Sequence, residues 1–171
     1  MRPFGARTPQ TARRRWCLTL YSQLKVMCNI KLRQSTESDR DFVNNLTRRT
    51  MRAYVESTWS RAEDVEHYYL ISQFNQPKTK IIQCNGEDIG RITVSHLHDK
   101  MLLEAIHIYE DFQGKGIGGY LINRVIREAK ERRLSLELIL LKANPAIKLY
   151  ERIGFCVYKE DENRYYMRMA V

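Results

Sequence analysis

The chain has 171 residues and a formal net charge of +9 at pH 7, a length typical of one compact domain with a substantial buried core. Every apolar run is shorter than the roughly 18–20 residues that a membrane-spanning helix needs, so no membrane span is predicted. Six basic and no acidic residues lie in residues 1–28. The rest of the chain therefore carries a net charge of only +3. This charge does not predict binding to nucleic acid.

Residues 1–28 form a basic leader without apolar periodicity, which we expect to be disordered or not native to the protein. An organelle transit peptide would show the same basic, acid-free composition, whereas polar residues interrupt the apolar stretch that a secretory signal needs. A true start at Met27 is the interpretation we favour, because an ordinary domain opening follows it. The domain is then expected to span residues 29–171.

The domain opens with a predicted strand at residues 29–33 and a helix. Thr36 and Asp39 have the spacing of a helix capping pair, and the helix behind them is predicted to run to about Arg52. Its expected inward positions are Phe42, Val43, Leu46 and Thr50.

An aromatic-rich connection at residues 51–59 is expected to lead into a second helix. Ser60 and Glu63 repeat the capping spacing, and the helix is predicted to end near Phe74. Its expected inward positions are Val65, Tyr68, Tyr69 and Ile71.

The remainder of the chain alternates between strand and helix patterns. Asn85-Gly86 predicts a tight hairpin turn, and Asn144-Pro145 predicts a helix start with Asn as N-cap. Strands are predicted at residues 79–84, 89–97, 102–109, 134–141, 155–158 and 165–169, and helices at 116–132 and 145–153. The order β, α, α, β, β, β, α, β, α, β, β predicts an α/β fold, a mixed sheet with helices on both faces.

A glycine-rich turn follows the fourth predicted strand and opens a helix, an arrangement that suits phosphate because first-turn N–H groups lack helical partners. Gly114, Gly116 and Gly119 satisfy the G-x-G-x-x-G pattern of dinucleotide-binding folds. That pattern is expected after a first strand, however, and Ile139 stands where its acidic residue would lie. The Walker pattern also fails, because Lys115 is not followed by Ser or Thr.

Two motifs together match a known family. The pattern Gln113-x-x-Gly116-x-Gly118, after a strand that carries Glu104, resembles motif A of the GCN5-related N-acetyltransferases, and residues 144–155 (NPAIKLYERIGF) resemble motif B. The resemblance covers the domain that follows the leader. It implies the acyl-CoA N-acyltransferase fold, with a mixed, mostly antiparallel central sheet, and acetyl-CoA as co-substrate.

The resemblance also implies which residues bind the coenzyme. Backbone N–H groups of the turn would hold the diphosphate, and a strand that splays from its neighbour would pair with the pantetheine amides. Asn144 would contact the pantetheine arm, although it lies six positions before Tyr150 where many members have an interval of seven. The implied cofactor-binding residues are Ile106, His107, Ile108, Gln113, Gly114, Lys115, Gly116, Ile117, Gly118, Gly119 and Asn144.

Two residues are implied as catalytic. Tyr150 stands where the family keeps its general acid, and Glu104 matches a strand carboxylate that serves some members as general base. For both residues a structural role remains an alternative: an ion-pair partner for Glu104 and an interface side chain for Tyr150. His107 is expected to be a packed, hydrogen-bonded histidine rather than a base.

In the family that the sequence resembles, the acceptor pocket is usually lined by the first two helices and the segment that joins them. The resemblance therefore implies an acceptor site at residues 52–59. Tyr54, Glu56 and Trp59 could form an aromatic, acidic site for a cationic amine. The alternative is that Tyr54 and Trp59 simply pack the helix junction.

The sequence thus predicts an N-acetyltransferase that moves an acetyl group from acetyl-CoA to a primary amine of a small molecule or peptide by direct attack. An inactive acyl-CoA sensor is the alternative, nucleic-acid binding by the leader is a second, and a homodimer is left open. Four cysteines without paired or metal-ligand spacing predict reduced thiols in a cytoplasmic protein, and no metal site. They are Cys17, Cys28, Cys84 and Cys156.

Overall fold

The computed structural model describes residues 29–72 and 74–169. The predictions made for the leader, and for its two cysteines, lie outside these residues. None of the helices within the described ranges is long and apolar enough to cross a membrane.

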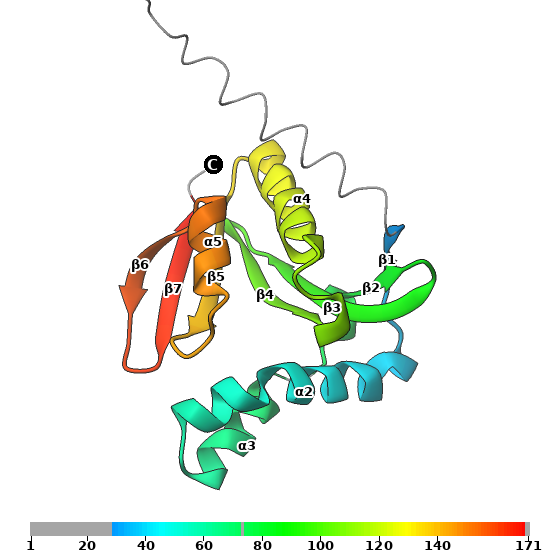
Figure 1. Ribbon diagram of the computed structural model, residues 1–171. Helices are drawn as coiled ribbons and strands as arrows, with labels where there is room; N and C mark the ends of the chain where they lie inside the picture. The colour runs from blue at the N-terminus through cyan, green and yellow to red at the C-terminus, as the bar shows by residue number, and fades with distance from the viewer. Residues whose placement is uncertain (1–28, 73, 170–171) are drawn as a thin grey trace, which may run out of the picture.

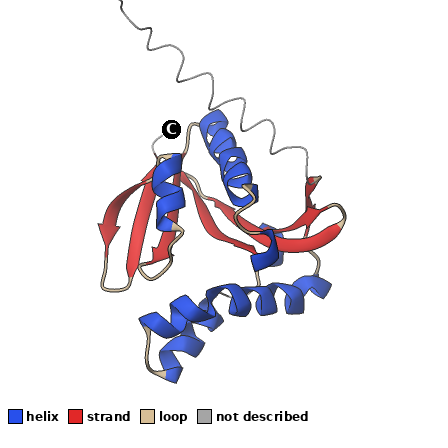
Figure 2. Ribbon diagram, in the orientation of Figure 1, coloured by secondary structure: helices blue, strands red, loops and turns tan. Residues whose placement is uncertain are grey.

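A seven-stranded sheet forms the centre of the domain, in the order β1-β2-β3-β4-β5-β7-β6 (Figures 1 and 2). Only β4 and β5 pair in parallel; the other neighbouring strands described are antiparallel. The mixed, mostly antiparallel sheet is therefore confirmed. The strands are β1 Ile30–Gln34, β2 Thr79–Cys84, β3 Glu87–His96, β4 Lys100–Ile108, β5 Ser135–Leu141, β6 Cys156–Glu160 and β7 Arg164–Met169.

Helices cover both faces of this sheet, as predicted. In Figure 1, α2 and α3 lie on one side, and α4 and α5 lie on the other. The helices are α2 Arg40–Thr58, α3 Ala62–Ile71, α4 Ile117–Arg132 and α5 Ile147–Ile153, with 3₁₀ turns at Glu37–Asp39, Gln76–Lys78 and Glu110–Phe112. The order of strands and helices is that predicted from the sequence.

The main core lies between the sheet and α4. This helix is amphipathic because its apolar residues recur at helical spacing, and Leu121, Ile122 and Ala129 are at most 1% exposed. Each fully buried aliphatic side chain of this kind stabilises the fold by roughly 1.5–3 kcal/mol. The helix is thereby fixed on the sheet, and its N-terminus is held beside the end of β4.

Several predicted boundaries are wrong. The predicted connection at residues 51–59 is helical as far as Thr58, because Met51 and Val55 continue the buried stripe of α2. The capping pair at Ser60 does not form, since α3 begins at Ala62 behind Arg61. This helix ends at Ile71, which is 58% exposed rather than inward.

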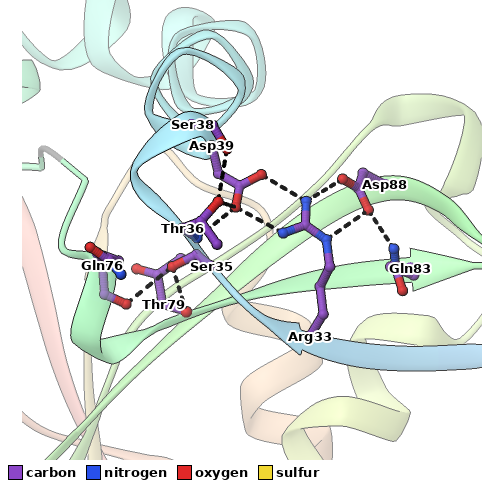
Figure 3. A network of polar contacts seen from close by, with 9 residues as sticks. All are labelled: Arg33, Ser35, Thr36, Ser38, Asp39, Gln76, Thr79, Gln83 and Asp88. Atoms are coloured by element: carbon purple, nitrogen blue, oxygen red, sulfur yellow. Dashed lines mark hydrogen bonds and ion pairs between the residues drawn. The ribbon is translucent and has the colours of Figure 1, made fainter.

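A polar network ties β1 to the start of α2 (Figure 3). Arg33 donates to both oxygens of Asp39 at 2.7 and 2.8 Å, and its guanidinium also pairs with Asp88. Asp39 accepts from the backbone N–H of Thr36 at 2.7 Å, so the predicted capping pair forms. The hydrogen bond from Arg33 is the main reason that the pKa of Asp39 lies below its usual range.

The cysteine predictions are only partly right. Cys84 is buried in β2 and is disulfide-bonded, so the prediction of a reduced thiol is wrong there. Cys156 is a free thiol, exposed on β6.

Candidate active site

The parallel pair at the middle of the sheet separates before either strand ends. The β4–β5 ladder runs from Lys100 and Ser135 to Leu103 and Leu138 and stops there. Yet β4 continues to Ile108, and Figure 1 shows the two strands diverging. Beyond Leu103, β4 stays paired to β3 on one side only. Backbone groups on its other edge are therefore free to bind an extended ligand.

A bulge in β4 lies where the separation begins. Thr93 of β3 is paired with Ala105 and Val94 with Leu103, so Glu104 is the extra residue between them. A bulge of this kind redirects a side chain. Ser95 Oγ and Lys78 Nζ contact the Glu104 carboxylate, the latter at 3.3 Å. Glu104 is thus partnered and lies at the wall of the cavity described below.

The turn before α4 leaves backbone donors facing outward. Gly114 and Gly116 have φ angles of +70° and +80°, a left-handed conformation that glycine adopts without strain. Gln113 Nε2 donates to the Ile108 carbonyl at 2.7 Å, which fixes the turn to the end of β4. No side chain caps the helix at Gly116. The first-turn N–H groups remain available for an anion.

Lys115 lies in this turn and Asn144 lies between β5 and α5, and the two have different local partners. The ammonium of Lys115 lies 5.3 Å from the ring centre of the neighbouring Phe112. Asn144 Oδ1 accepts from the backbone N–H of Ala146 at 2.9 Å, which closes a turn ahead of the helix. The N-cap of α5 is Ala146, so the prediction of Asn144 as N-cap is wrong. Helix α5 begins at Ile147 rather than at the predicted residue 145.

Tyr150 is buried in α5 with its ring edge-on to Phe155, at 5.7 Å between centroids. Burial raises the pKa of its phenol to about 12, so the hydroxyl stays protonated at neutral pH. This hydroxyl makes no hydrogen bond within the described residues. Every buried side-chain nitrogen or oxygen atom there does have a hydrogen-bond partner, so the hydroxyl oxygen is not one of the buried atoms. The hydroxyl must therefore reach the surface of the cavity that Tyr150 lines.

One cavity of about 2720 Å³ joins these features. The predicted residues that line it are Tyr54, Glu104, Ile106, His107, Ile108, Gln113, Gly114, Lys115, Gly116, Ile117, Gly118, Gly119, Asn144 and Tyr150. Glu56 is not among its lining residues and pairs with Arg52 at 2.8 Å. Trp59 is also outside and packs on Tyr68, with ring centres 5.7 Å apart. The predicted acidic acceptor site is therefore not assembled.

Sequence reasoning missed Arg91, which lines the same cavity from β3. Its Nε donates to His107 Nδ1 across the β3–β4 pair at 3.4 Å. Burial lowers the pKa of Arg91 to about 10, and burial followed by the charge of Arg91 lowers the pKa of His107 to about 3. His107 is therefore neutral at physiological pH and a poor base. The signal that could have revealed Arg91 is its charge inside an apolar strand.

The described residues contain no group of three side chains able to hold a metal ion. The groups that line the cavity include backbone donors, the Glu104 carboxylate, the protonated phenol of Tyr150 and the buried cation of Arg91.

The sequence profile of the acetyltransferase (GNAT) family matches residues 44–155. An uncharacterized N-acetyltransferase of Methanocaldococcus jannaschii is 33% identical over 84 residues, which amount to 44% of this chain and 37% of that relative.

Solved structures resemble most of this chain. A PaiA N-acetyltransferase from Thermoplasma acidophilum, crystallised in complex with coenzyme A, has a TM-score of 0.69 at 16% identity and covers 84% of this chain and 99% of that chain. An acetyltransferase from Thermus thermophilus has a TM-score of 0.63 at 17% identity and covers 85% and 99%. At these identities the likeness is one of fold, and it confirms the predicted fold.

Proposed function

Because the chain belongs to the acetyltransferase (GNAT) family, we propose that residues 29–171 form an N-acetyltransferase domain that uses acetyl-CoA to acetylate a primary amine. The observation that carries this proposal is the join between three features: the end of the β4–β5 ladder, the uncapped start of α4 and the Tyr150 hydroxyl all meet one cavity. A ligand with an anionic end and a reactive end needs such a connected path.

The residues around α4 fit the charged end of the coenzyme. The N–H groups after Gly116 suit a diphosphate, and the positive end of the helix dipole adds favourable potential. Lys115 of the turn lines the cavity, and so do Arg127 and Lys130 farther along α4. The unpaired edge of β4 at Ile106–Ile108 suits the amides of the pantetheine arm, which would pair with it like an added strand.

The reacting groups can be assigned from their chemistry. Acetyl-CoA supplies the acetyl group as a thioester. Glu104 accepts a proton from the attacking amine as the N–C bond forms, directly or through water. Tyr150 donates a hydrogen bond to the sulfur as the C–S bond breaks. Its pKa of about 12 exceeds that of a thiol, about 8.5, so the phenol stabilises the leaving thiolate without losing its own proton.

Binding and transfer can be tested separately. We expect calorimetry to detect acetyl-CoA binding, and a panel of amines to include acceptors that release CoA thiol. Binding without thiol release from any amine would favour an acyl-CoA sensor over an enzyme. Failure to bind acetyl-CoA at millimolar concentration would overturn the proposal.

A matched pair of variants tests where the diphosphate binds. The position of a Cβ at Gly118, the second residue of α4, meets only Ile108 Cδ1, at 4.0 Å. Gly118→Asp and Gly118→Asn therefore place side chains of the same shape beside the expected anion. The aspartate should weaken CoA binding about 10-fold relative to the asparagine by repulsion, although an acidic residue in a first turn stabilises a helix. Equal dissociation constants would place the diphosphate elsewhere.

A further inference from the structure

The β3 strand carries a buried cation that no described carboxylate pairs with. Arg91 is 3% exposed, and the hydrogen bond from its Nε to His107 is the one that its side chain makes within residues 29–72 and 74–169. A buried charge without a partner is unfavourable, so such groups in native proteins indicate a ligand or bound water.

The terminal nitrogens of Arg91 are directed to the cavity. Buried side-chain nitrogen and oxygen atoms of the described residues all have partners. The two terminal nitrogens of Arg91 have none there, so they must be accessible from the cavity that this residue lines. Tyr68 of α3 and Glu104 of β4 line the cavity too, and both interact electrostatically with Arg91 without forming an ion pair or hydrogen bond with its side chain. Burial leaves the guanidinium protonated at neutral pH, because its pKa remains about 10.

The charges around the cavity divide into two groups. Its lining contains six Arg and Lys residues and one acidic residue, Glu104. Four of the cations lie on or beside the turn, α4 and α5, where a polyanionic coenzyme accounts for them: Lys115, Arg127, Lys130 and Arg152. The other two, Arg91 and Arg164, lie on β3 and β7. These two cations lie away from the elements expected to bind the coenzyme and are therefore available to bind the acceptor.

We infer that Arg91 binds a carboxylate of the acceptor, so that the substrate is an amino acid or another amine that carries a carboxylate. This inference rests on the proposed acetyl transfer. A guanidinium offers two parallel N–H donors that match the two oxygens of a carboxylate. Because His107 beside it is neutral, Arg91 contributes one net charge, which suits a monoanion better than a phosphate dianion.

The opposite charges of Arg91 and Glu104 then orient the acceptor. Arg91 holds the carboxylate, and Glu104 takes a proton from the amine. The amine nitrogen bonds to the acetyl carbon, the sulfur leaves as thiolate, and the product is an N-acetylated acid. An acceptor with two positive charges, such as a polyamine, would face Arg91 with the wrong sign.

Matched acceptors test this assignment. CoA thiol release is measured with amino acids and with their primary amides, leucine against leucinamide and phenylalanine against phenylalaninamide. The amide has the less basic amine and so presents more free base, which makes it the better nucleophile in a site indifferent to charge. We expect the acids to have a kcat/KM about 10- to 100-fold higher.

Substitutions at Arg91 assign the preference to this residue. Arg91→Gln should abolish the preference for the acid, so that kcat/KM for the acid falls to that for the amide, whereas Arg91→Lys should retain part of the preference. The dissociation constant for CoA should be unchanged in both, which shows that the fold and the coenzyme site are intact. Equal use of acid and amide by the wild type, or an undiminished preference in Arg91→Gln, would overturn the inference. A marked preference for O-phosphoethanolamine over leucine would do the same.

A binding measurement separates this inference from the proposed function. Calorimetry of the CoA-saturated protein with N-acetyl-leucine and N-acetyl-leucinamide needs no turnover. Tighter binding of the acid, lost in Arg91→Gln, supports the carboxylate site even if every amine fails to release thiol, an outcome that would overturn only the proposed transfer. Equal binding of the two ligands overturns the carboxylate site even if amines are acetylated.

Discussion

Arg33 and Arg91 lie in one row across the sheet, on either side of Ile81, because both are paired with that residue of β2. Residues paired in this way point to the same face. Arg33 is held by two carboxylates, Asp39 and Asp88. Arg91 has no carboxylate partner among the described residues and is much more deeply buried.

The difference separates a structural charge from a functional one. Each guanidinium nitrogen of Arg33 donates to a carboxylate, and the network fixes β1 to the start of α2 (Figure 3). Arg91 is buried without an ion pair to the described residues, and the Tyr150 hydroxyl makes no hydrogen bond to them. Both of these groups open to the same cavity. Polar groups without partners reduce stability locally, and they commonly occur at functional sites.

The largest expected effect concerns the unpartnered phenol. Tyr150→Phe removes one oxygen that has no hydrogen-bond partner in the described structure, so the free energy of unfolding should hardly change. The kcat should fall about 10²- to 10³-fold, because the leaving thiolate loses its donor. Assays of thiol release measure kcat, and urea unfolding measures the free energy of unfolding. An unchanged kcat would remove Tyr150 from the reaction.

For Arg33, the arginine whose charge is paired, the substitution Arg33→Met should destabilise the protein. It leaves Asp39 and Asp88 without their shared partner, and we expect the free energy of unfolding to fall by about 2 kcal/mol, with kcat unaltered. Urea unfolding at pH 7 measures this.

A surface ion pair supplies the control for Arg33. Arg52→Met breaks the exposed pair with Glu56 and should change the free energy of unfolding by less than about 0.5 kcal/mol. Equal effects of the two substitutions would contradict the structural role of the Arg33 network. Because pairing lowers the pKa of Asp39, the contribution should be present at neutral pH and disappear as the pH falls below about 4.

A smaller effect of opposite sign is expected at Arg91. Arg91→Met removes a buried, unpaired charge from an otherwise apolar strand, so unfolding should need about 1 kcal/mol more rather than less. Urea unfolding without ligands measures this change. A loss of stability as large as that of Arg33→Met would show that Arg91 is a structural charge like Arg33, and the comparison would fail.

The smallest effect at neutral pH concerns His107. Its pKa is about 3 in the folded protein and about 6.5 when unfolded, so the unfolded state binds the extra proton between these values. Stability should therefore decrease as the pH falls below 6.5. His107→Asn should make this dependence shallower, and substitution of the exposed His98 by Asn serves as the control. Parallel curves for the wild type and His107→Asn would contradict the shift.

Local patterns explain why most of the fold could be predicted. Asn85-Gly86 is a hairpin turn with positive φ at both residues, and the apolar stripe of α4 is continuous in sequence. The turn from Gln113 to Gly118 and the helix that follows are likewise encoded by neighbouring residues. Such features need no information from elsewhere in the chain.

The acceptor side could not be predicted in the same way. Extension of α2 to Thr58 depends on Val55 packing against the sheet, and this extension turns Glu56 outward to Arg52. The role of Arg91 depends on which strands border β3 and on what α2 and α3 leave uncovered. The charge of Arg91 inside an apolar strand is a local signal, but no pattern within a few residues shows which cavity or partner the side chain meets.

The sequence by itself determined the elements, their order, and the turn whose glycines free the backbone N–H groups of α4, because hydrogen bonding and periodicity act over a few residues. Tertiary structure decided where β4 leaves β5, that Tyr150 and Arg91 open to one cavity, and that Glu56 does not. These outcomes depend on burial and on charge pairing between residues far apart in the chain. Only the packed structure determines which charges find partners.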